Sequence, residues 1–328
     1  MRPSFLLVDG HSLAYRSYYA HAKSYRGGLR TSTGIPTSAT YGFLKALLQA
    51  IATHQPGYLA VAFDRDEPTF RHELDANYKS DRAEAPEDFF PDVENLRELL
   101  EAMGLQVVTY AGYEADDIIG TLTERAVAAR VSPQGCRRFG SVKILSGDRD
   151  LFQLIHSETH GTGEALCQVT VLYPSTKDGM VEYDSDRVKE KLGVTPEQVV
   201  DYKALCGDAS DKIPGVRGIG EKTAAKLLAT YPSLDAIYDA LAEIKGAVQK
   251  KLEVGRDEAY RSQHLARIVL DVPLDLDLEA CKLQAFDFAR LNPLLQKLEF
   301  NSFQADLDRI QQKLGGTNRE STEARAQT

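Results

Sequence analysis

Residues 4–10 read SFLLVDG, a short apolar run that ends at once in a carboxylate, Asp9. Runs of this length with polar boundaries are typical of buried strands. The pattern returns in YLAVAFD, which ends at Asp64, and in KILSGD, which ends at Asp148. The sequence therefore predicts buried strands that each deliver an acidic side chain at the carboxyl end.

Helical patterns separate these strands along the first half of the chain. The runs of strand length are Ser4–Val8, Tyr58–Phe63, Val142–Leu145 and, more weakly, Gln106–Thr109; the helical patterns are Ala39–Ala52, Pro91–Met103 and Ala115–Ala129. Alternation of strands and helices predicts an α/β fold with a parallel, doubly wound sheet. In such a sheet, ligands bind beyond the carboxyl ends of the strands.

Nine carboxylates form five short clusters, four of them after predicted strands and the fifth before a glycine hairpin. They are Asp9, Asp64, Glu114, Asp116, Asp117, Asp148, Asp150, Asp208 and Asp211. Taken singly, several could be helix caps, because acidic side chains bind the free N–H groups of a first helical turn. Gathered at one edge of a sheet, they would repel one another unless cations held them. Mg²⁺ combines a few carboxylates with water and phosphate oxygens, so the set indicates metal-assisted phosphoryl chemistry.

The strand signals stop near Asp184, and helical patterns follow. They cover Asp186–Leu192, Pro196–Leu205, Lys222–Ala229, Leu234–Ala242 and Arg256–Ile268. Within them, residues 213–228 read IPGVRGIGEKTAAKLL, in which glycine turns lead into a helix. Such a hairpin aims backbone N–H groups at an anion and indicates a contact to nucleic-acid backbone without sequence readout. From Gly315 on, the chain is polar and lacks apolar periodicity, so a disordered tail is expected.

The connection from Asp64 to Pro91 is longer than connections in α/β folds usually are. It mixes charged residues, aromatic residues and prolines. One interpretation is a solvated excursion of the chain. The other is a mobile lid or arch in which Lys79 and Arg82 face phosphate and Phe70 or Tyr78 stacks on a base.

Composition is that of a globular protein, with 43% hydrophobic and 27% charged residues in 328. The net charge of −9 argues against a polyanionic partner, but residues 10–63 contain no Asp or Glu and do contain basic residues such as Arg16. Local patches are therefore the better guide. Four cysteines without paired spacing indicate free thiols in a reducing cytoplasm. No apolar run approaches the length of a membrane span.

The motifs DGHSLAYR, FDRDEPTFRHEL with YKSDRA, GYEADDIIG, ILSGDRDLFQL and LCGDASDKIPGVRGIGEKTAAKLL occur in this order between Ser4 and Phe303. Together they resemble the flap endonuclease superfamily, and more narrowly the bacterial 5′-nuclease domain at the N-terminus of DNA polymerase I. The resemblance implies a PIN/5′-nuclease-like α/β domain at 1–184 with a helical arch at about 65–92. It also implies a helical domain with a helix–three-turn–helix at 185–314, followed by the tail or linker at 315–328.

The resemblance also implies roles for individual residues. Asp9, Asp64, Glu114, Asp116 and Asp148, with Asp117 adjacent, would serve one Mg²⁺ or Mn²⁺, and Asp150, Asp208 and Asp211 a second. Lys79 and Arg82 would be the catalytic basic pair of the arch, and the hairpin would hold a K⁺. The candidate DNA contacts are Arg16, Phe70, Arg71, Tyr78, Lys212, Arg217, Gly218, Gly220, Lys222 and Thr223.

The function that this resemblance implies is a 5′-3′ exonuclease and 5′-flap endonuclease that cuts DNA, and RNA primers, during primer removal and repair. The expected partners are DNA with flaps, nicks or free 5′ ends and a linked or separate DNA polymerase, and the chain is expected to be a monomeric, nucleoid-associated protein of the cytoplasm. A catalytically silent module that binds branched DNA is the alternative. A degenerate relative should have lost some of the carboxylates, whereas all nine are present.

Overall fold

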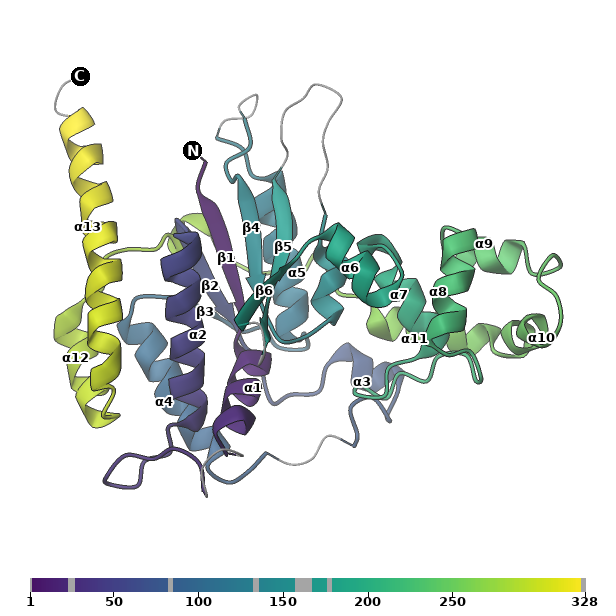
Figure 1. The fold of residues 1–328 in the computed structure, drawn as a ribbon, viewed down its shortest axis with the longest axis horizontal. Coiled ribbons are helices and arrows are strands. Elements are labelled where there is room, and N and C mark those ends of the chain that lie inside the picture. The colour runs from purple at the N-terminus through teal and green to yellow at the C-terminus, as the bar shows by residue number, and fades with distance from the viewer. Residues whose placement is uncertain are drawn as a thin grey trace.

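A central sheet organises the molecule (Figure 1). The computed structural model describes residues 2–22, 27–81, 85–131, 136–156, 167–175 and 179–325, with side chains up to residue 314. Within these ranges, a six-stranded sheet has the order β3-β2-β1-β4-β5-β6. Its strands are β1 (Ser4–Asp9), β2 (Tyr58–Ala62), β3 (Gln106–Val108), β4 (Ser141–Leu145), β5 (Gln168–Ser175) and β6 (Gly179–Tyr183).

The predicted parallel sheet is confirmed for the first five strands and needs one correction at the edge. β3, β2, β1, β4 and β5 pair in parallel, whereas β6 pairs antiparallel with β5. These two strands had no counterpart in the sequence prediction. They follow each other closely in the chain, and a short connection can only return as an antiparallel neighbour.

Helices cover both faces of the sheet, because side chains of a strand alternate between its faces. Leu6 and Val8 of β1 pack with α1 (Gly10–Ala22), α2 (Ser38–His54) and α4 (Phe89–Ala102). Phe5 and Leu7 face α5 (Ala115–Ala128) instead. The doubly wound arrangement therefore follows from an apolar β1 whose two faces are both buried. α2, α4 and α5 were predicted, and α1 was not.

Beyond Asp184 the described chain is helical, as predicted. Its elements are α6 (Ser185–Leu192), η2 (Pro196–Gln198), α7 (Val199–Cys206), α8 (Glu221–Thr230), α9 (Leu234–Asp239), α10 (Ala247–Val254) and α11 (Arg256–Ala266). α8, α9 and α10 form the far end of the molecule (Figure 1). The sheet meets this part through η1 (Asp150–Leu154) and α7, and the short α3 (Phe70–Leu74) lies beneath it.

The chain then passes β2 through η3 (Leu278–Cys281). It ends with α12 (Phe288–Lys297), η4 (Asn301–Phe303) and α13 (Gln304–Arg325), and α12 and α13 form the opposite end of the molecule (Figure 1). Leu291, Leu307 and Ile310 belong to the same apolar cluster as α2 and α4. The last part of the segment expected to form the helical domain, 185–314, therefore packs on the α/β domain. Apolar residues at helical spacing in α12 and α13 explain this packing, which the choice of a single boundary at Asp184 did not anticipate.

Two further sequence expectations fall partly outside the described residues. A tail was expected from Gly315, but α13 continues to Arg325. A helix anchored by Leu307 and Ile310 can extend through following residues, because each added hydrogen bond fixes only one residue. The sequence of 132–140 and of 157–168 predicts two long surface loops, and residues 132–135 and 157–166 of them lie outside the described residues, as do 326–328.

Candidate active site

The carboxyl ends of three central strands meet at one edge of the sheet. Asp9 is the last residue of β1 and pairs in register with Ala62, two residues before Asp64. On the other side, Val8 pairs with Leu145, so that Asp148 follows β4 at the same level. The prediction that the strand-end carboxylates gather at one edge is therefore confirmed for these three residues.

Asp9 is buried at this edge and is held by its surroundings. Its carboxylate accepts hydrogen bonds from the backbone N–H of Ser12 at 3.0 Å and from the hydroxyl of Ser146 at 2.5 Å. Burial, together with the negative charges of Asp148 and Asp64, raises the pKa of Asp9 to about 7. A bound cation would oppose this shift, because it favours the charged carboxylate.

The start of α5 supplies the next group of carboxylates. Glu114 is the N-cap residue of α5, and its side chain and that of Asp117 form a reciprocal capping box. The backbone N–H of Ala115 donates to Asp64 at 2.7 Å, which ties the end of β2 to this helix. Burial and the negative charges of Asp9 and Asp148 raise the pKa of Asp116 well above the usual range.

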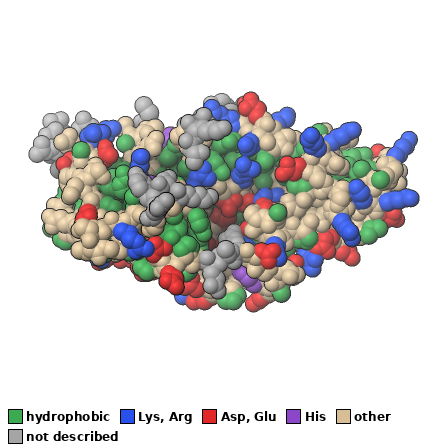
Figure 2. Space-filling view, turned by 60° about the horizontal axis from the view of Figure 1, so that its bottom comes forward, with side chains coloured by type: hydrophobic (Ala, Val, Ile, Leu, Met, Phe, Trp, Pro, Cys, Tyr) green, Lys and Arg blue, Asp and Glu red, His purple; other side chains and the backbone are tan. Residues whose placement is uncertain are grey.

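These side chains line one cavity of about 450 Å³. Its acidic wall consists of Asp9, Asp64, Glu114, Asp116 and Asp148, and its other polar and aromatic residues are Ser12, His11, Tyr15, Tyr19 and Lys79. In Figure 2, acidic side chains are set back in a hollow near the middle of the molecule, with Lys and Arg side chains around it. Five of the nine predicted carboxylates therefore share one cavity.

Lys79 reaches this cavity from the arch segment. Its ammonium lies 2.9 Å from Glu114 and 3.8 Å from Asp211. Its backbone is left-handed, with φ of 55°, and its N–H donates to the carbonyl of Asp211 at 3.1 Å. Burial alone would raise the pKa of Glu114, but Lys79 and Arg71 lower it below the usual value. Arg82, the predicted second member of the basic pair, lies outside the described residues.

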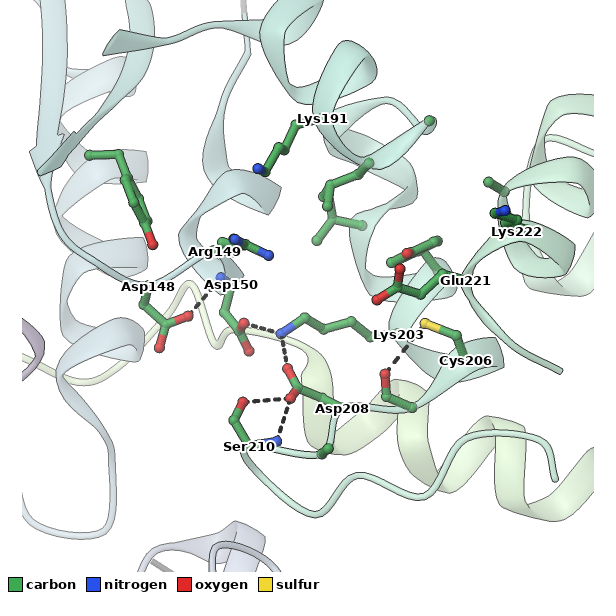
Figure 3. A pocket seen from close by; sticks show the side chains of 18 of the residues that line it. Asp148, Arg149, Asp150, Lys191, Lys203, Cys206, Asp208, Ser210, Glu221 and Lys222 are labelled. Carbon is green, nitrogen blue, oxygen red and sulfur yellow. Dashed lines mark hydrogen bonds and ion pairs between the residues drawn. The ribbon is translucent and has the colours of Figure 1, made fainter. Parts of the chain in front are cut away.

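A second acidic group surrounds a lysine that the sequence analysis missed. The ammonium of Lys203, on α7, forms ion pairs with Asp150 and, at 2.6 Å, with Asp208 (Figure 3). Lys203 is only 8% exposed. Burial alone would raise the pKa of Asp208, but Lys203 lowers it to about 2. The signal in the sequence was a single lysine in the otherwise apolar end of α7, five residues before Asp208.

Two predicted site residues serve another purpose. The guanidinium of Arg71 binds both carboxylate oxygens of Asp117, at 2.7 and 2.8 Å. Asp117 also accepts the backbone N–H groups of Glu114 and Val269. With Asp117 0% and Arg71 2% exposed, this pair is a buried link between the arch, α5 and the segment after α11. Arg71 therefore cannot be a surface DNA contact, and the oxygens of Asp117 are already occupied.

Tyr78 also differs from its predicted role. It is 3% exposed, and its hydroxyl donates to Glu114 at 3.1 Å and to Asp211 at 3.4 Å. A side chain buried in this way cannot stack on a base. Phe70 is half-buried, with ring contacts to Tyr113 and His264. Arg16 lies over the ring of Tyr173 at 5.1 Å.

The glycine hairpin lies apart from the cavity, at the start of α8. Arg217, Gly218, Gly220 and Lys222 are exposed there, Thr223 is half-buried, and Lys212 pairs with Asp81. Gly218 has φ of 84°, a conformation that favours glycine. Its carbonyl accepts a hydrogen bond from the ammonium of Lys251, on α10, at 2.8 Å. The structure thus provides a protein cation at the place where the resemblance implied K⁺.

The donor set of the cavity suits hydrated divalent ions. In the described part of the chain, no three His, Cys, Asp or Glu side chains stand close enough to hold an ion by themselves. Mg²⁺ usually keeps several waters and binds through one or two carboxylates. Carboxylates spread around a cavity, with raised pKa values at Asp9 and Asp116, therefore fit ions that are bound partly through water.

The arrangement of a mainly parallel sheet with an adjoining helical part is similar to that of solved 5′-nuclease structures. T5 5′-exonuclease with bound zinc superposes with a TM-score of 0.64 at 18% identity, over 95% of this chain and 98% of that one. Flap endonuclease-1 from Methanococcus jannaschii gives a TM-score of 0.60 at 18% identity, over 96% of this chain and 94% of that one.

The family models match in the same way. The 5′-3′ exonuclease N-terminal resolvase-like domain covers residues 4–193, and the 5′-3′ exonuclease C-terminal SAM fold covers 194–289. The chain belongs to the 5′-3′ exonuclease family. It is 53% identical to the DNA polymerase I of Synechocystis over 94% of its length and 41% identical to that of Chloroflexus aurantiacus over 91%. It spans about 30% of the length of each. None of the described helices has both the length and the apolar character needed to cross a membrane.

Proposed function

We propose that this chain hydrolyses phosphodiesters of DNA, and of RNA primers, as a 5′-3′ exonuclease and 5′-flap endonuclease. The main support for this proposal is the cavity at the carboxyl edge of the sheet, which is lined by five carboxylates and Lys79. Two Mg²⁺ or Mn²⁺ ions, when bound, supply the activation of water and the neutralisation of charge that phosphodiester hydrolysis requires. Asp9, Asp64, Glu114, Asp116 and Asp148 would hold the first ion.

The second ion belongs with Asp150, Asp208 and Asp211 in this proposal. Lys203 now neutralises Asp150 and Asp208, so the ammonium must share or yield these oxygens when an ion binds. Lys79, and Arg82 from the sequence, would orient the scissile phosphate and stabilise charge that develops on it. Selectivity would be for structure, a 5′ end at a junction of single and double strands, because the hairpin contacts backbone rather than bases.

Fewer residues remain as proposed DNA contacts than the sequence suggested. Arg217, Gly218, Gly220, Lys222 and Thr223 remain the proposed contacts of the hairpin to the DNA backbone, because they are at least partly exposed. Arg16, Phe70 and Lys212 remain candidates as well. K⁺ at the hairpin has little support, since Gly218 already binds the ammonium of Lys251. We also propose that the chain acts as a monomer on nucleoid DNA in the cytoplasm, joined to or beside a DNA polymerase, as the names of its relatives suggest.

Cleavage of a 5′-labelled double-flap DNA in Mg²⁺ and in EDTA tests the proposal. We expect metal-dependent cuts near the flap junction and none with Asp148→Asn or Asp116→Asn, while both variants keep wild-type circular dichroism and duplex affinity. Full cleavage by either variant would exclude the assigned metal site. Tight binding of the flap without cutting in Mg²⁺ or Mn²⁺ would favour the alternative, a silent branched-DNA-binding module.

A further inference from the structure

A second cavity, of about 900 Å³, lies between the sheet and the helical part of the chain. It is lined from η1, α6, α7 and the start of α8, and its wall includes Asp148, which also lines the first cavity. The two cavities therefore meet at Asp148. The second one extends from there to Lys222, at the hairpin.

Two cations of this cavity have no role in the site described so far. They are Arg149, next to η1, and Lys191, near the end of α6. Figure 3 shows the ammonium of Lys191 and the guanidinium of Arg149 facing the same part of the cavity. Both residues are exposed, and neither takes part in an ion pair among the described residues.

Two like charges that face the same space repel each other unless an anion lies between them. Of the carboxylates that line the cavity, Asp150 and Asp208 are paired with Lys203. The other two, Asp148 and Glu221, form no ion pair with Arg149 or Lys191 among the described residues. An exposed Arg and an exposed Lys are the usual phosphate contacts of nucleic-acid-binding proteins. The continuation of the cavity to Lys222 indicates an extended polyanion rather than a single small anion.

We propose that Arg149 and Lys191 bind the phosphodiester backbone of the cut strand on the 3′ side of the scissile phosphate. This inference rests on the proposed function. A 5′-nuclease leaves the single-stranded or released part on the 5′ side and the duplex on the 3′ side. The second cavity leads from the catalytic edge to the hairpin, whose exposed surface can accommodate a duplex. The part of the strand on the 3′ side of the scissile phosphate therefore binds in the second cavity. The first cavity, with Lys79 of the arch, takes the 5′ side.

The salt dependence of binding tests the contact itself. Affinity for a double-flap DNA is measured in EDTA, where no strand is cut, at several salt concentrations. Loss of one phosphate contact lowers the slope of log affinity against log salt by about 0.9. We expect Arg149→Ala and Lys191→Ala each to lower the slope by about this amount and the double variant by about twice as much. Lys189→Ala is the matched control, since Lys189 lies on α6 but does not line the cavity.

Neutral methylphosphonates locate the contact on the strand. Each DNA carries a single methylphosphonate, placed in turn at each of the first phosphates on the 3′ side of the junction and, in a second series, on the 5′ side. At the contacted position, the modification should lower the DNA affinity of the wild type and leave the DNA affinity of the corresponding variant unchanged, as in a double-mutant cycle. Slopes equal to the wild type in both variants would overturn the proposal, and so would coupling to phosphates on the 5′ side. Failure of the wild type to cut in Mg²⁺ is a separate result that bears on the proposed function.

Discussion

At the scale of single residues, buried charges decide which predicted site residues can act. Most of the carboxylates could be predicted because they follow a strand or open a helix, and Asp208 and Asp211 because they precede the glycine hairpin. Their cationic partners could not, because Arg71 and Asp117 are 46 residues apart and nothing local indicates their contact. Lys203 was missed although one partner, Asp208, follows five residues later, because its other partner, Asp150, is 53 residues away. Tyr78 was assigned to base stacking because a long polar connection usually exposes its side chains, and Arg71 was assigned to DNA only through the resemblance.

Lys79 is expected to be catalytic rather than structural. In Lys79→Ala, we expect the single-turnover cleavage rate to fall by about 10²-fold, because one charge that stabilises the transition state is lost. The number of bound Mn²⁺ ions, measured by calorimetry, should stay the same. Lys79→Arg is the control, and it should recover part of the rate. An unchanged single-turnover rate in Lys79→Ala would contradict the role.

Arg71 is expected to act on stability. Arg71→Met leaves the carboxylate of Asp117 buried without its cation, which costs about 3–5 kcal/mol in the free energy of unfolding. Urea unfolding followed by circular dichroism measures the change. Adding Asp117→Asn should restore part of the stability, because the unpaired charge is removed as well. If Arg71→Met unfolded like the wild type and lost only DNA affinity, the surface role predicted from the sequence would be correct instead.

At the scale of elements, the helices with the clearest apolar periodicity were the ones that the sequence predicted correctly. α2, α4 and α5 carry apolar residues at helical spacing and were located to within a few residues. α1 was missed because its sequence, GHSLAYRSYYAHA, mixes small, polar and aromatic residues without a clear apolar stripe. β5 was missed although its run QVTVLY is rich in residues that favour strands, and β6 was missed because its five residues, GMVEY, give only a weak local signal. The packing of α12 and α13 on α2 and α4 could not be predicted, because an apolar stripe looks the same whichever core it covers.

The hairpin before α8 gives a prediction at this scale. Lys251, on α10, supplies a positive charge to the carbonyl of Gly218, so wild-type duplex affinity should not depend on K⁺. Replacing K⁺ by tetramethylammonium at constant ionic strength should leave that affinity unchanged. Lys251→Met should bind several-fold more weakly, and K⁺ should restore part of the loss. Lys250→Met on the same helix is the control. A wild-type affinity that falls in tetramethylammonium would show that a bound K⁺ is needed after all.

At the scale of the whole molecule, the catalytic edge of the sheet lies between two dissimilar ends. The helical part from α6 to α11 adjoins this edge and contributes Lys203, Asp208 and Asp211. α12 and α13 cover α2 and α4 at the other end and contribute none of the proposed catalytic residues (Figure 1). The C-terminal helices are therefore expected to stabilise the α/β domain without forming part of the site.

Truncation separates these contributions. A chain that ends at residue 303 loses α13, including Leu307 and Ile310, which are 0% and 3% exposed. Each such side chain contributes about 1.5–3 kcal/mol when buried, so the free energy of unfolding should fall by about 3–6 kcal/mol. Because the chain has no Trp, urea unfolding is followed by circular dichroism. A chain that ends at residue 314 keeps both side chains and should change by less than about 0.5 kcal/mol. Equal stability of the two truncated chains would mean that α13 does not stabilise the α/β domain, and the domain division at Asp184 would then stand.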